Sequence, residues 1–107
     1  MLPPRTDIAA APYAEWAHYN WVWLNNGDQN QSKMVDLVEG YRSRGIAVGA
    51  INIDSTWSNG TNDFTVNTDK FPDVAGLIKD MHGLGIRVIM WVTSMINDDA
   101  SSYQEAL

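Results

Sequence analysis

The stretch "GIAVGAINID", residues 45–54, gives the first indication of the fold. Val48 to Ile53 is a short, nearly all-apolar run, as expected of a parallel strand that is covered on both faces. Gly45 stands where a preceding helix would stop, and Asp54 ends the apolar run abruptly. A carboxylate at the mouth of a buried strand therefore needs either a structural or a functional explanation.

A second stretch of the same kind follows later in the chain. "GIRVIMWVTS", residues 85–94, aligns without gaps on residues 45–54, and both run from a helix stop through Gly-Ile-x-Val into an apolar strand. Two copies do not establish a repeat, because this order is common where strands and helices alternate. They do agree on a strand–helix–strand–helix–strand order, so we predict the α/β class with parallel strands and right-handed crossovers.

The remaining elements complete this pattern. The aromatic and β-branched segment "WAHYNWVWLN", residues 16–25, favours a first strand, and residues 86–94 the third. Residues 1–15 contain three prolines and little periodicity, which predicts an extended lead-in before a domain portion at 16–107. The polar tail after residue 95 begins a new loop with room for a helix.

Two helices are predicted between the strands. The first runs from Ser32 to the stop at Gly45, and the second opens at Pro72-Asp73 and ends at the glycines 83 and 85. Apolar residues recur at i, i+3, i+4 and i+7 along both, which predicts one buried face on each. These inward positions are Met34, Leu37, Val38 and Tyr41 in the first helix, and Val74, Leu77, Ile78 and Met81 in the second.

Composition excludes several classes of function. The 107 residues amount to at most one small domain, and a net charge of −6 without a basic run argues against nucleic acid as a partner. No apolar run approaches the ~20 residues of a membrane span, and the absence of cysteine excludes disulfides and thiol chemistry. His18 and His82 lack carboxylates at ligand spacing, and no phosphate-binding glycine turn is present, so we expect neither a metal nor a cofactor.

The ends of the three predicted strands carry the residues that suggest function. Ligands of parallel α/β proteins bind at the carboxyl ends of the strands. Carboxylate, amide, hydroxyl and indole groups together suit a neutral, polyhydroxylated ligand, because carboxylates accept from hydroxyls and indoles pack on C–H faces. The strand-end residues are Trp23, Leu24 and Asn25, then Asp54, Ser55 and Trp57, then Trp91, Thr93 and Ser94.

Each candidate also has a structural interpretation. Asp54 could cap a short turn after its strand, Trp57 could cover the end of the sheet, and Trp91 could belong to the core. The pattern also leaves both a doubly wound sheet and a (β/α)8 barrel open. A phospho-accepting receiver domain is disfavoured, because the first strand ends in "WLNNG" without the acidic residues that such a domain needs.

Several segments, taken in order, resemble glycoside hydrolase family 31, the α-glucosidase-type clan of retaining glycosidases. The most specific piece is Asp-x-x-Trp at residues 54–57, followed by "NDF", "KFPD" and "H…GIRVIMWV", and the resemblance covers roughly residues 16–103. It implies a partial (β/α)8 TIM barrel of about the first three βα units. It also implies that Asp54 binds sugar hydroxyls in the −1 subsite, and that Trp57 and Trp91 help to wall that subsite.

The resemblance implies that this chain is a fragment of an enzyme and carries no catalytic residue. Retaining hydrolysis needs two carboxylates ~5–5.5 Å apart, and in this family they are expected on later strands. The partners would then be an oligosaccharide or glycoside substrate and the remainder of the chain's own catalytic domain. Two alternatives stay open: a stand-alone α/β carbohydrate-binding or regulatory module, and a barrel glycosidase of a related family. Ser55 and Thr56 stand where known members place an acidic or aromatic residue, which leaves the preferred sugar open.

Overall fold

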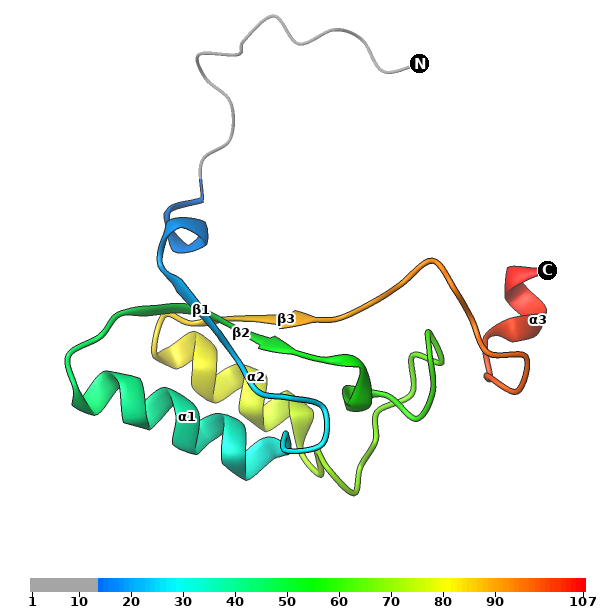
Figure 1. Cartoon of the computed structure of the whole chain (residues 1–107), viewed down its shortest axis with the longest axis horizontal. Coiled ribbons are helices and arrows are strands. Elements are labelled where there is room, and N and C mark those ends of the chain that lie inside the picture. Colours follow the sequence, from blue (N-terminus) through cyan, green and yellow to red (C-terminus); the bar gives the residue numbers. More distant parts are fainter. Residues whose placement is uncertain (1–13) are drawn as a thin grey trace, which may run out of the picture.

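A computed structural model describes residues 14–107, in which three strands form one parallel sheet (Figure 1). The strands are β1 (Asn20–Trp23), β2 (Val48–Ile53) and β3 (Arg87–Met90), and they lie side by side in chain order. Both neighbouring pairs are parallel. The predicted α/β class with parallel strands is therefore confirmed.

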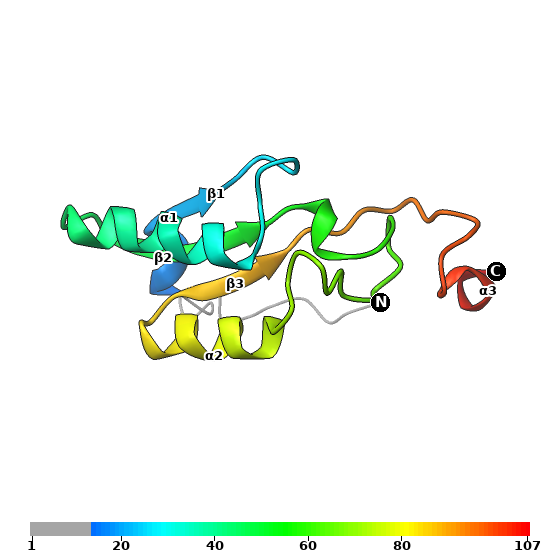
Figure 2. The ribbon, with the colours of Figure 1, turned by 90° about the horizontal axis from the view of Figure 1, so that it is seen from below.

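Two helices connect the strands and lie on the same face of the sheet (Figures 1 and 2). They are α1 (Gln31–Ser43) and α2 (Val74–Gly83). Each begins at a side-chain cap: Asn30 accepts a hydrogen bond from the Lys33 N–H at 2.9 Å, and Asp73 accepts one from the Gly76 N–H at 3.0 Å. These bonds satisfy backbone donors that have no partner in the first turn of a helix.

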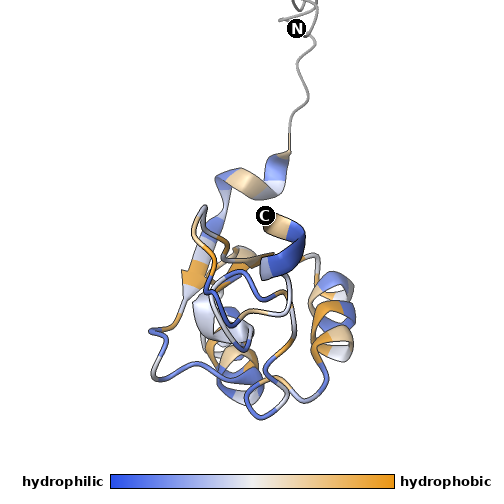
Figure 3. Cartoon of the chain, turned by 90° about the vertical axis from the view of Figure 1, so that its right-hand side faces the viewer, coloured by the Kyte–Doolittle hydropathy of each residue, from blue (hydrophilic) through white to orange (hydrophobic). Residues whose placement is uncertain are grey.

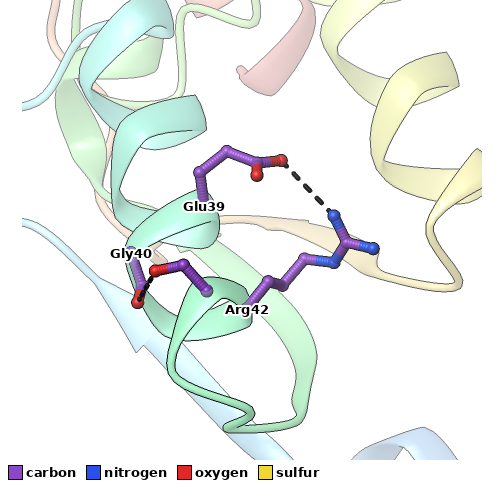
Figure 4. A network of polar contacts seen from close by, with 4 residues as sticks. Glu39, Gly40 and Arg42 are labelled. Carbon is purple, nitrogen blue, oxygen red and sulfur yellow. Dashed lines mark hydrogen bonds and ion pairs between the residues drawn. The ribbon is translucent and has the colours of Figure 1, made fainter.

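The predicted helix stops are confirmed. Gly45 and Gly85 follow the two helices with φ angles of 71° and 77°, a left-handed conformation that glycine adopts without steric cost. In the last turns of α1, Arg42 pairs with Glu39 at 3.4 Å (Figure 4). Both side chains are about half exposed, at 45% and 59%, so water screens the pair and it adds little stability.

The hydrophobic core lies between the sheet and the two helices. Hydrophobic residues alternate with hydrophilic ones along the helices (Figure 3), as the periodicity predicted, and the inward-facing ones meet the strands. The fully or nearly fully buried members of the core are Val22, Ile51 and Ile53 from the sheet, Met34 and Val38 from α1, and Leu77 and Met81 from α2, together with Trp57, Phe71 and Ile86. Leu37, Tyr41 and Val74 pack against this core and are partly buried, whereas Ile78, also predicted to face inward, is partly buried outside it.

Among the described residues no α-helix covers the opposite face of the sheet, and only the short 3-10 helix η2 (Glu15–His18) packs there, through Trp16. Trp21 and Trp23 alternate with Val22, so their side chains lie on the face that the helices leave uncovered. They are 49% and 51% exposed, and the ring of Trp21 stacks on Trp16 with the ring centroids 5.7 Å apart. A sheet with helices on one face and an open second face is the arrangement that strands of a (β/α)8 barrel require, since their second face lines the interior.

The prediction of one strand over residues 16–25 is wrong at its beginning. Glu15–His18 forms a short 3-10 helix, η2, and β1 begins only at Asn20. Asn20 pairs with Val48, the first residue of β2, so residues before Asn20 have no strand beside them. Of the predicted lead-in, residues 1–13 lie outside the described residues.

The third strand is also shorter than the predicted 86–94. Its last residue, Met90, pairs with Ile53, where β2 ends. Trp91 still donates its N–H to the Ile53 carbonyl at 2.9 Å, and the chain then leaves the sheet. The tail folds into loops and one short helix, α3 (Tyr103–Ala106).

Candidate functional site at the carboxyl ends of the strands

Three of the predicted strand-end residues lie at the same edge of the sheet. Trp23 is the last residue of β1, Asp54 follows β2 directly, and Trp91 follows β3. Because the three strands are parallel and adjacent, their carboxyl ends form a common rim. After Asp54 the chain turns into the short 3-10 helix η3 (Ser55–Trp57), which begins the long connection to α2.

Two N–H groups hold the Asp54 carboxylate. Trp23 Nε1 donates to Oδ2 at 2.8 Å, and the Ser55 N–H donates to Oδ1 at 2.6 Å. Asp54 is therefore the N-cap of η3, as the structural interpretation expected, and it is also bonded to the neighbouring strand. A carboxylate has about four lone-pair positions, so each oxygen can still accept a hydroxyl from a ligand.

The backbone of Asp54 is bonded to a side chain that no sequence motif singled out. Gln29, in the loop between β1 and α1, is only 1% exposed. Its Oε1 accepts from the Asp54 N–H at 3.0 Å, and its Nε2 donates to the Asp54 carbonyl at 3.0 Å and to Thr56 Oγ1 at 2.7 Å. In the sequence this glutamine stands in the polar run "NNGDQNQ", which looks like any exposed loop.

Trp57 and Trp91 differ in exposure. Trp57 is 7% exposed and belongs to the hydrophobic core, whereas Trp91 is 36% exposed. The indole N–H of Trp57 donates to the carbonyl of Trp91 at 2.8 Å. Trp57 therefore ties η3 to the end of β3 from beneath the rim, and Trp91 stands at the surface.

The loop after η3 is fastened to the loop after β3 through Asn62. The Asn62 side chain donates to the carbonyls of Thr93 and Met95, the latter at 2.7 Å, and accepts from the Thr93 N–H at 3.2 Å. Asn62 has a φ angle of 52°, and asparagine tolerates this left-handed conformation better than most residues. These bonds fix the direction in which the chain leaves the rim at Trp91.

The neighbouring Asp63 links the same loop to the tail. Its carboxylate accepts from Ser101 Oγ at 2.6 Å and from Thr65 Oγ1 at 2.7 Å. The hydrogen bond from Ser101, followed by the one from Thr65, lowers the pKa of Asp63 below its ordinary value. Ser102 adds a bond to the Asn62 carbonyl at 2.6 Å. The loops after β2 and β3 thus form one hydrogen-bonded unit.

Within residues 14–107 no three His, Asp or Glu side chains gather where they could hold a metal ion. None of the helices in these residues is both long enough and apolar enough to cross a membrane.

Comparison with protein families decides the family. Residues 8–107 match the model described as the glycosyl hydrolases family 31 TIM-barrel domain. The chain belongs to glycoside hydrolase family 31. Its three parallel strands are accordingly part of a TIM barrel, and the resemblance noted from the sequence is confirmed.

Individual family 31 proteins resemble the chain over most of its length. It is 28% identical over 90 residues to the "Alpha-xylosidase XylQ" of Lactiplantibacillus pentosus, which covers 79% of this chain and 12% of the relative. It is 24% identical over 87 residues to the "Myogenesis-regulating glycosidase" of Mus musculus, covering 80% and 12%. The chain thus spans about an eighth of the length of these curated relatives.

Solved structures of the family share the fold. A family 31 α-xylosidase from a soil metagenome, complexed with xylose, has a TM-score of 0.76 at 17% identity and covers 86% of this chain and 14% of that one. A family 31 α-xylosidase from Xanthomonas citri has a TM-score of 0.72 at 24% identity, covering 84% and 10%.

Proposed function

We propose that this chain supplies part of the −1 sugar-binding subsite of a retaining glycoside hydrolase that acts on α-linked glycosides. The observation that carries the proposal is the Asp54 carboxylate, held by two N–H donors at the rim, with the exposed indoles of Trp23 and Trp91 on the adjoining strand ends. Membership of family 31 supports the same reaction class.

The chemistry of this rim suits a sugar ring. A carboxylate with free lone pairs accepts from two neighbouring hydroxyls, and such charge-assisted hydrogen bonds are roughly twice as strong as neutral ones. Indole faces pack against the apolar C–H groups of a pyranose. In this proposal Asp54 and Trp91 contact the sugar, and the buried Trp57 supports the subsite by holding the carbonyl of Trp91.

We assign binding, and not bond cleavage, to these residues. Retaining hydrolysis uses one carboxylate as nucleophile and a second as acid/base, about 5–5.5 Å apart. Asp54 accepts hydrogen bonds from Trp23 and Ser55, which orient its carboxylate and suit a binding role. We place the catalytic pair on later strands of the same barrel, outside these 107 residues.

The substrate that we propose carries an α-linked sugar of the glucose configuration. Glucose and xylose present the same ring hydroxyls and differ in the hydroxymethyl group on C5, so the hydroxyls that Asp54 would bind are common to both. The relatives named α-xylosidase support an α-xyloside. The α-glucoside stays the alternative, because the sequence motifs resemble the α-glucosidase-type clan.

The test uses the protein encoded by the complete reading frame that contains these codons. We expect it to hydrolyse nitrophenyl α-xyloside or α-glucoside but not the β-anomers, and to release the α-anomer first by NMR. Asp54→Ala should lower kcat/KM by about 2–4 kcal/mol in transition-state binding, because the charge-assisted bonds to the sugar are lost. Asp69→Ala, which removes an exposed carboxylate from the loop before α2, is the matched control and should leave kcat/KM within twofold.

Two results would overturn this proposal. Unchanged kcat/KM in Asp54→Ala would remove Asp54 from the subsite. Saturable sugar binding without turnover of any glycoside would favour the stand-alone binding module instead.

A further inference from the structure

Gln29 is unusual among the described residues because its side-chain amide is fully buried and hydrogen-bonded to the backbone of one strand-end residue, Asp54. At 1% exposure it is among the least accessible side chains of residues 14–107. A buried side-chain amide is costly unless its donors and acceptor are bonded. Here Oε1 and Nε2 both bond to the backbone of Asp54, so the two ends of the amide are used on one residue.

The amide of Gln29 takes the place of a neighbouring strand's backbone beside Asp54. β2 ends at Ile53, and the last ladder pair to β3 is Ile53 with Met90. One residue further on, Asp54 would have an unpaired N–H and carbonyl on the side of β1. The amide of Gln29 offers an acceptor and a donor, each at 3.0 Å, and so continues the ladder for one more residue. This keeps the backbone of Asp54 extended, with ψ at 179°.

Further hydrogen bonds fix the position of Gln29 beside Asp54. Its Nε2 also donates to Thr56 Oγ1 at 2.7 Å, and Thr56 in turn donates to the Asn26 carbonyl at 3.3 Å. Lys70 Nζ donates to the same carbonyl at 3.1 Å, and Asn26 Nδ2 donates to Ser55 Oγ at 3.0 Å. The loop after β1 is therefore hydrogen-bonded to Asp54 and to both residues that follow it.

We infer that Gln29 is a positioning residue for the sugar site: it sets the backbone of Asp54 so that the carboxylate lies within reach of Trp23 and faces the ligand. Gln29 itself does not contact the sugar, since it is buried beneath the rim. The inference rests on the proposed role of Asp54.

The expected effect is kinetic as well as structural. A misplacement of about 1 Å in a catalytic site can cost on the order of 100-fold in rate. Gln29→Met has nearly the same volume but neither donor nor acceptor, so it frees the Asp54 backbone without opening a cavity. We expect it to lower kcat/KM by about 10- to 100-fold, and to weaken binding of a transition-state-like iminosugar more than it weakens binding of free xylose or glucose.

Gln31→Met is the matched control. Gln31 also uses its side-chain oxygen to accept the backbone N–H of an aspartate, Asp73, at 2.9 Å, but this aspartate is the N-cap of α2 and not a strand-end residue. Its replacement removes the same kind of bond and should lower the melting temperature while kcat/KM of the folded enzyme stays within twofold. A purely structural role of Gln29 would give the same result as this control.

Thr56→Val provides a second variant in case Gln29→Met does not fold. Valine keeps the shape of threonine but removes the oxygen that holds Nε2 of Gln29. We expect a smaller loss in kcat/KM, about two- to fivefold, because one of the three bonds of the amide is lost.

The outcomes separate this inference from the proposed function. All variants are made in the complete protein and compared with Asp54→Ala. If Asp54→Ala loses activity while Gln29→Met and Thr56→Val match Gln31→Met, Asp54 binds the sugar but Gln29 does not position it, and the inference is overturned. If Asp54→Ala is as active as the unaltered protein, the proposed function fails and the inference fails with it. Selective losses in Gln29→Met and Thr56→Val support it.

Discussion

Replacing Trp23 by phenylalanine tests how the rim orients Asp54. Trp23 Nε1 donates to Asp54 Oδ2 at 2.8 Å, and phenylalanine keeps an aromatic ring without the donor. The bond from the Ser55 N–H to Oδ1 remains in this variant. The substitution therefore removes one hydrogen bond from the carboxylate and leaves its second one in place.

The size of the effect follows from the exposure of the pair. Hydrogen bonds to charged groups contribute about 1.5–3 kcal/mol. Trp23 is 51% exposed, so water can take over part of the lost donation and the loss should be nearer 1 kcal/mol. At about 1.4 kcal/mol per factor of ten, kcat/KM should fall about fivefold. Part of this loss reflects greater rotational freedom of the carboxylate in the free enzyme.

A double-mutant cycle distinguishes orientation of Asp54 from direct stacking on the sugar. We would measure kcat/KM on the nitrophenyl α-glycoside for Trp23→Phe, Asp54→Ala and the double variant. If Trp23 acts through Asp54, its replacement costs about fivefold in the unaltered protein and less than twofold once the carboxylate is gone. An equal factor in both backgrounds would refute this reasoning, because Trp23 would then act on the ligand without Asp54. Trp21→Phe, on the same strand and face, is the control.

Three further predictions concern the scaffold of the rim. Gly49→Ala should destabilise the protein by about 1–3 kcal/mol, because an added Cβ would lie 2.3 Å from the carbonyl oxygen of Trp16. Thermal unfolding should show a lower melting temperature while kcat stays unchanged. An unaltered melting temperature would contradict this prediction. Asp63→Asn should remove a contribution to stability that is present above the ordinary aspartate pKa near 4 and is lost as pH falls through the lowered pKa of the folded state. The difference in melting temperature between the two proteins should therefore shrink from pH 6 to pH 3, and a constant difference would argue against it. Asn62→Gly keeps the left-handed backbone but loses the bonds to residues 93–95, so it should lower the free energy of unfolding by about 1–2 kcal/mol. Asn62→Ala should lower it further, because alanine also strains the left-handed backbone. Equal melting temperatures for the two variants would exclude this strain.

Local pattern was sufficient for the elements that carry their own signals. β2 occupies Val48–Ile53 as predicted, because a nearly all-apolar run of this length favours a buried strand. Gly45 ends the helix before it, since glycine adopts a φ of 71° without steric cost. The inward positions of the helices follow from the period of 3.6 residues, which brings them onto one face. The order of these elements and the short motifs around Asp54 were also enough to identify the family, which the family model then confirmed.

The lengths of the outer strands depended on their neighbour and not on their own residues. "WAHY" has the composition of a strand, but β2 begins at Val48 and offers no partner before Asn20, so the chain coils into η2 instead. β3 stops at Met90 for the same reason, because β2 ends at the paired Ile53. A strand persists only where another strand satisfies its backbone N–H and C=O groups, and that is a property of the sheet.

The sequence by itself determined the α/β class, the family and the place of Asp54 at the end of a buried strand, because these follow from local periodicity and from short motifs. Only the tertiary structure decided what surrounds that carboxylate. Trp23 and Gln29 lie 31 and 25 residues from Asp54 along the chain and meet it because β1 and β2 are parallel neighbours. Burial of Gln29 and of Trp57 was decided in the same way, since an amide or an indole is buried only where the fold supplies partners for its polar groups.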